Sequence, residues 1–322
     1  MRLNVVTHEL VMKACPPFAS CHASSVLVLP NGDILAAWFG GTEEGAPDVA
    51  IWGSRCVKGQ WSEPFKIADK PGIPHWNPVL FLSQEGSIYL FYKVGHQIPT
   101  WQTFITRSLD GGLSWTDPCE MVEGDVGGRG PVKNKILTLR NGRLLAPASL
   151  EDREWNAFVD ISDDGGQTWT AGPLIPLDRS QLKGRGVIQP TLWESHPNHV
   201  HMLLRSTEGV IYRSDSNDGG STWSEAYPTD LPNNNSGIDV VQTGQGTLAL
   251  VYNPVGIDWG PRTPITLAVS VDNGESWSEG LILESGEGEY SYPAVVSRGN
   301  DLFITYTWNR TNIAFWHVIL GG

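Results

Sequence analysis

The sequence predicts an all-β protein, a six-bladed β-propeller of four-stranded antiparallel blades. Five tryptophans recur every 54 residues, at positions 61, 115, 169, 223 and 277. Each repeat also carries a similar pair of apolar strands, and 322 residues accommodate about six such repeats. A period near 50 residues is long enough for four short strands and their turns, which is the content of one propeller blade.

Four of the tryptophans end near-copies of one short motif. The copies are SLDGGLSW (108–115), SDDGGQTW (162–169), SNDGGSTW (216–223) and SVDNGESW (270–277), and a degenerate copy, SRCVKGQW, ends at Trp61. These residue types suit a tight hairpin, because Asp caps backbone amides, Gly adopts positive φ and Trp buries its ring between blades. One copy per blade around the rim cannot converge on a single ion, so the motif is interpreted as structural.

The expected strand pairs are apolar, β-branched runs separated by turns of the Asn-Gly kind. They span residues 22–40, 77–95, 134–150, 189–206, 236–253 and 292–308. Their near-continuous apolar character predicts burial on both faces. The sixth blade has a third strand in 312–320 but lacks the motif, and we expect the N-terminal strand, Leu3 to Met12, to pair with it and close the ring. The whole chain, 1–322, is then a single domain.

Composition narrows the class of partner. With 40% apolar and 18% charged residues the chain reads as a soluble globular protein, and it lacks both a membrane span and a secretory signal core, which predicts a cytoplasmic location. The four cysteines lack metal-site spacing and the density of a disulfide scaffold, which predicts reduced thiols. A net charge of −13 argues against nucleic acid, but arginines converging in a pocket would still bind a small anion.

The first strand of each propeller blade lines the central channel, so residues just ahead of the six strand pairs should face a common funnel. These residues are basic, polar and aromatic although the protein is acidic. They are His22, His75, Trp76, Asn77, Arg129, Lys133, Asn134, Lys135, Lys183, Arg185, Gln189, Asn234, Asn235, Ser236, Tyr290 and Tyr292. Arg205, after the second strand of blade four, and Arg262, in an insertion of blade five, add guanidinium forks suited to a carboxylate.

The repeated motifs resemble the Asp boxes, or BNR repeats, of the sialidase (neuraminidase) superfamily over nearly the whole chain. The resemblance implies three arginines on a substrate carboxylate, a tyrosine nucleophile assisted by a glutamate, and an aspartate as acid and base. A neutral phenol suits an anionic sugar because it does not repel the carboxylate. Tyr292 in the SYPAVV strand start resembles the nucleophile, with Tyr290 as its rival, and Arg205 and Arg262 resemble the second and third arginines.

Two positions depart from that pattern. Where the superfamily has its first arginine, in an Arg-Ile-Pro strand start, this chain has Cys21-His22-Ala23-Ser24, and Gln189 replaces the assisting glutamate. The segment GGTEEGAPD leaves Glu43, Glu44 and Asp48 as candidates for the acid. Further substrate contacts are expected from funnel residues, which are Gln189, Arg129, Lys133, His75, Asn77, Asn235 and Tyr290.

Three functions are compatible with this reading. The first is an exo-acting glycoside hydrolase on a terminal acidic sugar, sialic acid-like or within a uronate-containing glycan. The second is a polysaccharide lyase, in which arginine and lysine neutralise a uronate and His22, His75 or Tyr292 removes the neighbouring proton. The third is a non-catalytic glycan-binding propeller. No cofactor or metal is expected, because histidines such as His75 and His96 lack ligand spacing.

Overall fold

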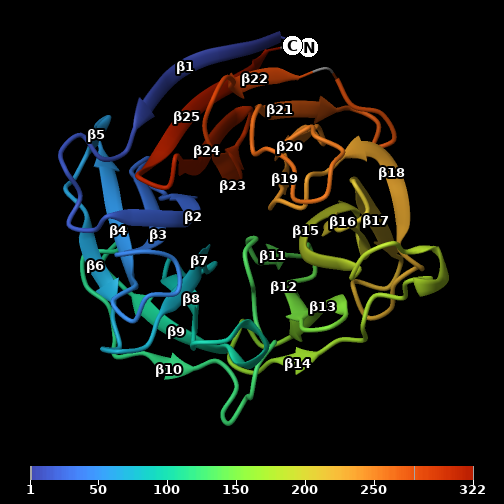
Figure 1. Ribbon diagram of the computed structural model, residues 1–322, viewed down its shortest axis with the longest axis horizontal. Coiled ribbons are helices and arrows are strands. Elements are labelled where there is room, and N and C mark those ends of the chain that lie inside the picture. The colour runs from blue at the N-terminus through green and yellow to red at the C-terminus, as the bar shows by residue number, and fades with distance from the viewer. Residues whose placement is uncertain (1, 279, 322) are drawn as a thin grey trace.

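The computed structural model describes residues 2–278 and 280–321, which form six antiparallel sheets arranged as a ring (Figure 1). The helical segments in this part of the chain are two single 3-10 turns, η1 (Ile98–Thr100) and η2 (Arg179–Gln181). None of the helices described is long and apolar enough to cross a membrane. The predicted all-β, six-bladed propeller is confirmed.

The blades follow one another along the chain. Blade one contains β2 (Ser20–Val28), β3 (Ile34–Gly41), β4 (Ala50–Val57), β5 (Gln60–Trp61) and β6 (Phe65–Ala68). Blade two contains β7 (His75–Leu82), β8 (Ile88–Val94), β9 (Gln102–Ser108) and β10 (Cys119–Glu120). Blade three contains β11 (Leu137–Thr138), β12 (Leu144–Glu151), β13 (Trp155–Ser162) and β14 (Thr170–Ala171).

The second half of the ring repeats this arrangement. Blade four contains β15 (Val187–His196), β16 (His199–Ser206), β17 (Val210–Ser216) and β18 (Tyr227–Pro232). Blade five contains β19 (Asp239–Gln242), β20 (Leu248–Tyr252), β21 (Ile265–Ser270) and β22 (Leu281–Glu284). Blade six contains β23 (Tyr290–Arg298), β24 (Asp301–Trp308), β25 (Asn312–Gly321) and β1 (Arg2–Leu10). Each predicted strand pair is therefore the first pair of one blade.

The N-terminal strand closes the ring, as predicted. β1 runs antiparallel to β25, from Arg2 opposite Gly321 to Leu10 opposite Ala314, so the two ends of the chain lie side by side (Figure 1). The Asn312 carboxamide continues the pairing beyond β1: it accepts from the Met12 amide at 3.1 Å and donates to the Met12 carbonyl at 2.9 Å. The pairing removes the free edge that β25 would otherwise present.

The Asp boxes are self-contained turns. In blade two, Asp110 accepts from the amides of Leu113 and Ser114 at 3.0 and 2.9 Å, and Ser108 Oγ accepts from the Gly112 amide at 2.8 Å. Gly112 has a φ of 86°, which favours glycine. Asp164, Asp218 and Asp272 make equivalent bonds within their own turns. The boxes are therefore structural.

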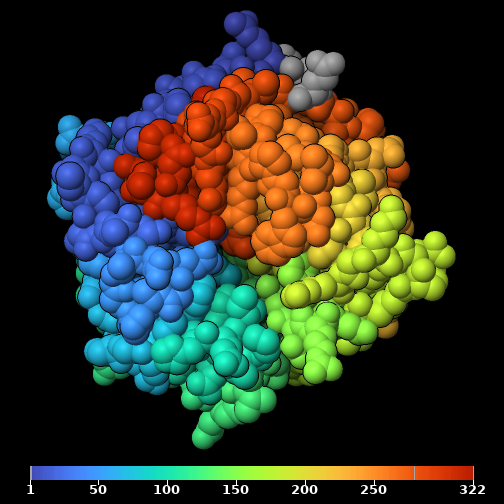
Figure 2. Space-filling view, in the orientation of Figure 1, coloured from blue at the N-terminus to red at the C-terminus, as the bar shows by residue number. Residues whose placement is uncertain are grey.

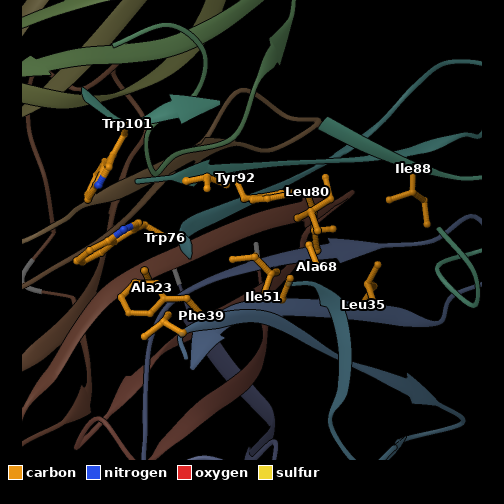
Figure 3. Close-up of a cluster of buried hydrophobic side chains, with 14 of the residues drawn as sticks. Ala23, Leu35, Phe39, Ile51, Ala68, Trp76, Leu80, Ile88, Tyr92 and Trp101 are labelled. Carbon is orange, nitrogen blue, oxygen red and sulfur yellow. The ribbon is translucent and has the colours of Figure 1, made fainter. Parts of the chain in front are cut away.

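The hydrophobic core lies between neighbouring blades, because the strands are apolar on both faces. Figure 3 shows the cluster between blades one and two, in which Phe39 and Ile51 face Leu80 and Tyr92. At its inner end the Trp76 and Trp101 rings lie 4.7 Å apart between centroids. Packing of this kind fixes each blade against the next and holds the first strands rigidly around the axis.

Deletion of residues 2–10 is expected to destabilise the whole ring, because it exposes the edge of β25 and the apolar surface beneath β1. The melting temperature should fall by several degrees, or the protein should aggregate on expression. The matched control is Val5→Ser with Val6→Ser, which changes two half-exposed side chains of β1 and keeps its backbone pairing. A truncated protein that melts like the parent would contradict the closure.

Candidate active site

The first strands of four blades carry a bulge near their start, and each bulge centres on a non-glycine residue with positive φ. The pairing register shifts in β2, β7, β15 and β23. The residues at these bulges are Ala23 (φ 55°), Asn77 (43°), Gln189 (52°) and Tyr292 (53°). Asn235, just ahead of β19, has a φ of 57°. Such backbone costs about 1–3 kcal/mol each and clusters at functional sites, where bulges re-aim side chains.

Tyr292 is in contact with two arginines. Arg205 Nη1 donates to the phenolic oxygen of Tyr292 at 2.7 Å, and its Cζ lies 5.8 Å from the ring centroid. The Cζ of Arg262 lies 5.4 Å from the same ring centroid. The Tyr292 hydroxyl therefore meets one guanidinium through a hydrogen bond, and a second guanidinium lies over its ring.

Arg205 is 3% exposed and is held from several sides. Its Nε donates to Asn235 Oδ1 at 2.8 Å, and its Nη1 donates to Gln189 Oε1 at 3.1 Å. Its guanidinium also lies over the Trp155 ring, 5.4 Å from the centroid. Burying a guanidinium is costly unless its donors are paired, and these partners accept its hydrogen bonds without adding a negative charge.

The structure adds a third arginine that the sequence analysis missed. Arg310 lies in the turn between β24 and β25, and its carbonyl accepts from the Cys21 amide at 2.7 Å. It therefore stands beside the strand start of blade one, where the superfamily carries its first arginine. Its position in the sequence could have revealed this arginine. Arg310 lies in the turn after the second strand of blade six, and ring closure brings blade six beside blade one.

Glu289 holds two of the arginines in place. It accepts from Arg262 Nη1 at 2.8 Å and from Arg310 Nε at 3.0 and 3.1 Å. Partial burial works against ionisation of Glu289, but hydrogen bonding from Arg310 and the charges of Arg262 and Arg310 outweigh it and lower its pKa. The carboxylate is therefore ionised at neutral pH and pre-orients both guanidinium groups.

His22 lies against the tyrosine. Its ring centroid is 4.3 Å from that of Tyr292, and its Nδ1 is buried with no hydrogen-bond partner in the described part of the chain. Burial lowers the pKa of His22 well below its ordinary value, and the charges of Arg310, Arg262, Arg205 and Lys133 lower it further. The imidazole is therefore neutral at neutral pH.

Lys133 lies at the inner end of the site. Its Nζ donates to Asn134 Oδ1 and the Ile238 carbonyl, both at 2.9 Å, and to the Pro293 carbonyl. A Cβ built on Gly237 would lie 2.9 Å from Lys133 Cε and 3.4 Å from Tyr292 Cγ, so the lysine and the tyrosine flank the same glycine. Burial lowers the pKa of Lys133 to about 7, while three oxygen acceptors favour its ammonium form.

Three residues that the sequence predicted to contact substrate instead bond to other groups of the protein. Arg129 does not face the funnel, because it pairs with the buried Asp160 at 2.6 Å and joins blades two and three. The prediction that His75 contacts substrate is also corrected. Its Nδ1 bonds the Val49 carbonyl at 3.0 Å and its Nε2 accepts from the Lys70 amide at 3.1 Å, so neither nitrogen is left for substrate. Tyr290 donates to the Glu287 carbonyl at 3.3 Å, so Tyr292 rather than Tyr290 meets Arg205.

The loop between β3 and β4 carries the candidate acids. Glu44 forms an ion pair with Arg310 and so joins the arginine cluster. Asp48 accepts from the amide and hydroxyl of Thr42 at 2.9 and 2.6 Å and is exposed, as is Glu43. A Cβ built on Gly45 of the same loop would lie 3.1 Å from the Trp76 ring, so this loop lies close to the start of β7.

Asn77 is 5% exposed at its bulge. In the part of the chain that the structure describes, no three His, Cys, Asp or Glu side chains gather closely enough to hold a metal ion.

The burial of His22 makes a prediction about stability. Its folded pKa is lowered, so the unfolded chain binds more protons below pH 6.5, the ordinary histidine value, and folding stability falls as the pH falls through that value. His22→Gln removes this dependence, so the melting temperature of the variant should fall less steeply than that of the parent. His75, whose pKa burial also lowers, titrates in both proteins and cancels in the comparison. Parallel curves would contradict a neutral, buried His22.

Comparison with known proteins identifies the fold and the superfamily. A sialidase of Vibrio cholerae is 29% identical over 205 residues, which cover 55% of this chain and 26% of that protein. The anhydrosialidase of Macrobdella decora is 28% identical over 225 residues, covering 63% of this chain and 28% of that protein. The chain thus matches about a quarter of the length of these curated relatives.

Solved structures match over almost the whole chain. A protein of unknown function from Dyadobacter fermentans superposes with a TM-score of 0.81 at 18% identity, covering 99% of both chains. A Hadza microbial sialidase superposes with a TM-score of 0.80 at 17% identity, covering 94% of this chain and 66% of that one. The model of the BNR repeat-like domain family matches residues 32–304. The chain therefore belongs to the BNR repeat-like family and, with its six blades and sialidase relatives, to the sialidase-like superfamily.

Proposed function

We propose that this protein is an exo-acting glycoside hydrolase that removes a terminal acidic sugar, sialic acid-like or uronate, from a glycan. The observation that carries the proposal is the gathering of Arg205, Arg262 and Arg310 around Tyr292 and His22. Three guanidinium groups at one site bind a carboxylate through charge-assisted, bidentate hydrogen bonds. The sialidases among its relatives support an acidic sugar as the substrate class.

In the proposed mechanism the substrate carboxylate pairs with the three arginines, two of which Glu289 already holds in place. The phenolic oxygen of Tyr292 then attacks the anomeric carbon and forms a glycosyl–tyrosine bond as the bond to the leaving oxygen breaks. A carboxylic acid of the 42–48 loop, Asp48 or Glu43, gives its proton to that oxygen. Water activated by the same carboxylate then releases the sugar and restores the tyrosine.

Activation of Tyr292 differs from the superfamily pattern because Gln189 cannot ionise. Arg205 donates to the phenol oxygen, and the neighbouring Lys133 adds positive potential. Burial and the surrounding cations keep His22 unprotonated, and we assign its imidazole, which lies against Tyr292, as the acceptor of the phenolic proton once the substrate carboxylate has offset the charges of the arginines. In this proposal Tyr292 is therefore surrounded by cations rather than assisted by a carboxylate.

One observation favours a second function, elimination at a uronate. His22 and Tyr292 lie in ring contact and Arg205 bonds the phenol directly, which is a suitable arrangement for removing a carbon-bound proton. The arginines would neutralise the uronate carboxylate and acidify the adjacent C–H. His22 or Tyr292 would take the proton as the glycosidic C–O bond breaks, leaving an unsaturated sugar.

A panel of sialosides, ulosonic acid glycosides and uronate-capped oligosaccharides distinguishes these functions. Released saturated acidic sugar is expected, with at least about a 10²-fold loss in Tyr292→Phe because the attacking oxygen is removed. Tyr290→Phe is the matched control, since its hydroxyl bonds only a backbone carbonyl. Near-ultraviolet absorbance of an unsaturated product would indicate the lyase instead. Binding without turnover, unchanged in Tyr292→Phe, would indicate a glycan-binding propeller.

Arg310→Met is expected to raise KM for the acidic sugar about 10- to 100-fold, because a charge-assisted hydrogen bond to the carboxylate is lost. Arg310→Lys should restore only part of this loss, since an ammonium cannot form the bidentate pair. Steady-state kinetics would be compared with Arg129→Lys, whose ion pair with Asp160 lies between blades. Equal KM values for Arg310→Met and the parent would contradict the third-arginine role.

A further inference from the structure

Arg205 is clamped by two carboxamides, and each carboxamide has a carboxylate behind it. On one side Asn235 Oδ1 accepts from Arg205 Nε at 2.8 Å, and Asn235 Nδ2 donates to Asp258 Oδ1 at 2.8 Å. On the other side Gln189 Oε1 accepts from Arg205 Nη1 at 3.1 Å, and Gln189 Nε2 faces Glu151 Oε1 at 3.5 Å. We propose that Asp258, assisted by Glu151, is a positioning residue that fixes these carboxamides oxygen-first on Arg205 and thereby holds Arg205 on Tyr292. This inference rests on the proposed role of Tyr292.

The physical need for such residues follows from the shape of a carboxamide. Its oxygen end and its NH2 end are nearly equal in size, so packing alone leaves both orientations open. With the NH2 end toward Arg205, two donors would face each other at a guanidinium that is 3% exposed, and the phenol's partner would shift. A carboxylate behind the NH2 end accepts only, so it selects the orientation that presents oxygen to Arg205.

The backbone supports this division of roles. Asn235 and Gln189 are 0% and 2% exposed and have φ of 57° and 52°, so the strained backbone fixes where each side chain enters the funnel. It does not determine which end of the carboxamide turns inward. That choice is left to Asp258 and Glu151.

Asp258 lies on an exposed loop that follows β20. It is exposed on the blade-five insertion, residues 254–264, part of the orange segment that rises beside the centre of the ring in Figure 2. Asn234 Nδ2 anchors the same insertion by donating to the Pro261 carbonyl at 2.6 Å. The neighbouring Trp259 ring lies 5.9 Å from the Arg205 guanidinium. An exposed loop is thus coupled to the phenol through Asn235 and Arg205.

The two carboxylates hold their carboxamides at different distances. The Asp258 contact is short at 2.8 Å, whereas the Glu151 contact is long at 3.5 Å. Glu151 also borders a cavity of about 200 Å³ that Lys93, Trp101 and Ser149 help to line. Loss of Asp258 is therefore expected to have the larger effect.

The first test compares Asp258→Ala with Asp258→Asn, which loses the charge but keeps an acceptor oxygen. Asp258→Ala is expected to lower kcat about 10- to 100-fold, more than it raises KM, because a hydrogen bond to a charged group is lost and the tyrosine's partner is misplaced. Asp258→Asn should lose activity to an intermediate extent, because its carboxamide keeps an acceptor oxygen but also donates and so selects the orientation less strongly. Glu151→Ala should lose less than Asp258→Ala. Asp163→Ala is the matched control, an exposed carboxylate that accepts from Arg143 at 2.8 Å in the blade-three box.

The second test needs no substrate. With 15N-labelled arginine, the Arg205 Nε–H signal, assigned by its loss in Arg205→Lys, should exchange with solvent slowly in the parent and about tenfold faster or more in Asp258→Ala. Asp163→Ala should behave like the parent, and Asp258→Asn should lie between the parent and Asp258→Ala. Unchanged exchange in Asp258→Ala would overturn the inference, as would a kcat loss in Asp258→Ala no greater than that in Asp163→Ala. Absence of turnover in the parent would refute the proposed function alone, since the exchange measurement still decides the positioning role.

Discussion

The candidate site depends on closure of the ring by β1 and β25. That pairing fixes the number of blades at six and brings blade six against blade one, so that the Arg310 carbonyl bonds the Cys21 amide. Because Tyr292 comes from blade six, His22 from blade one and Arg205 from blade four, the site exists only when the two ends of the chain meet. The stability of the ring and the geometry of the site therefore both depend on this closure.

A second constraint is the polar network along the central axis. The buried Asp239 accepts from Lys135 at 2.7 Å, from Thr191 at 2.6 Å and from the Val295 amide at 2.8 Å, and these residues belong to blades three, four and six. Removing one partner of a buried pair of this kind costs about 3–5 kcal/mol, because a charge is left without compensation. The network holds the first strands in the geometry that the strained bulges require.

The side chains of the site are mainly cationic, whereas the whole molecule carries a net negative charge. The chain carries a net charge of −13, yet Arg205, Arg262, Arg310 and Lys133 all act on His22, with Glu289 and Glu44 as their anionic neighbours. This excess of cations in a partly buried site is what an anionic sugar requires. In the proposed mechanism the same cations take the place of a carboxylate at Tyr292, which would explain how the site accommodates Gln189 where its superfamily has glutamate.

The sequence alone determined the fold, because a 54-residue repeat with four near-copies of the Asp box and apolar strands buried on both faces is typical of propeller blades. It also pointed to Tyr292, Arg205 and Arg262, which lie at or beside the strand starts that symmetry brings to the axis. The tertiary structure decided the roles of Arg310, Arg129 and His75. Arg310 gains its place from closure between the two ends of the chain, whereas the buried Asp160 draws Arg129 away and backbone groups occupy both nitrogens of His75. A repeat reports which residues occupy equivalent positions, but the partner of each side chain depends on contacts between blades that no local pattern contains.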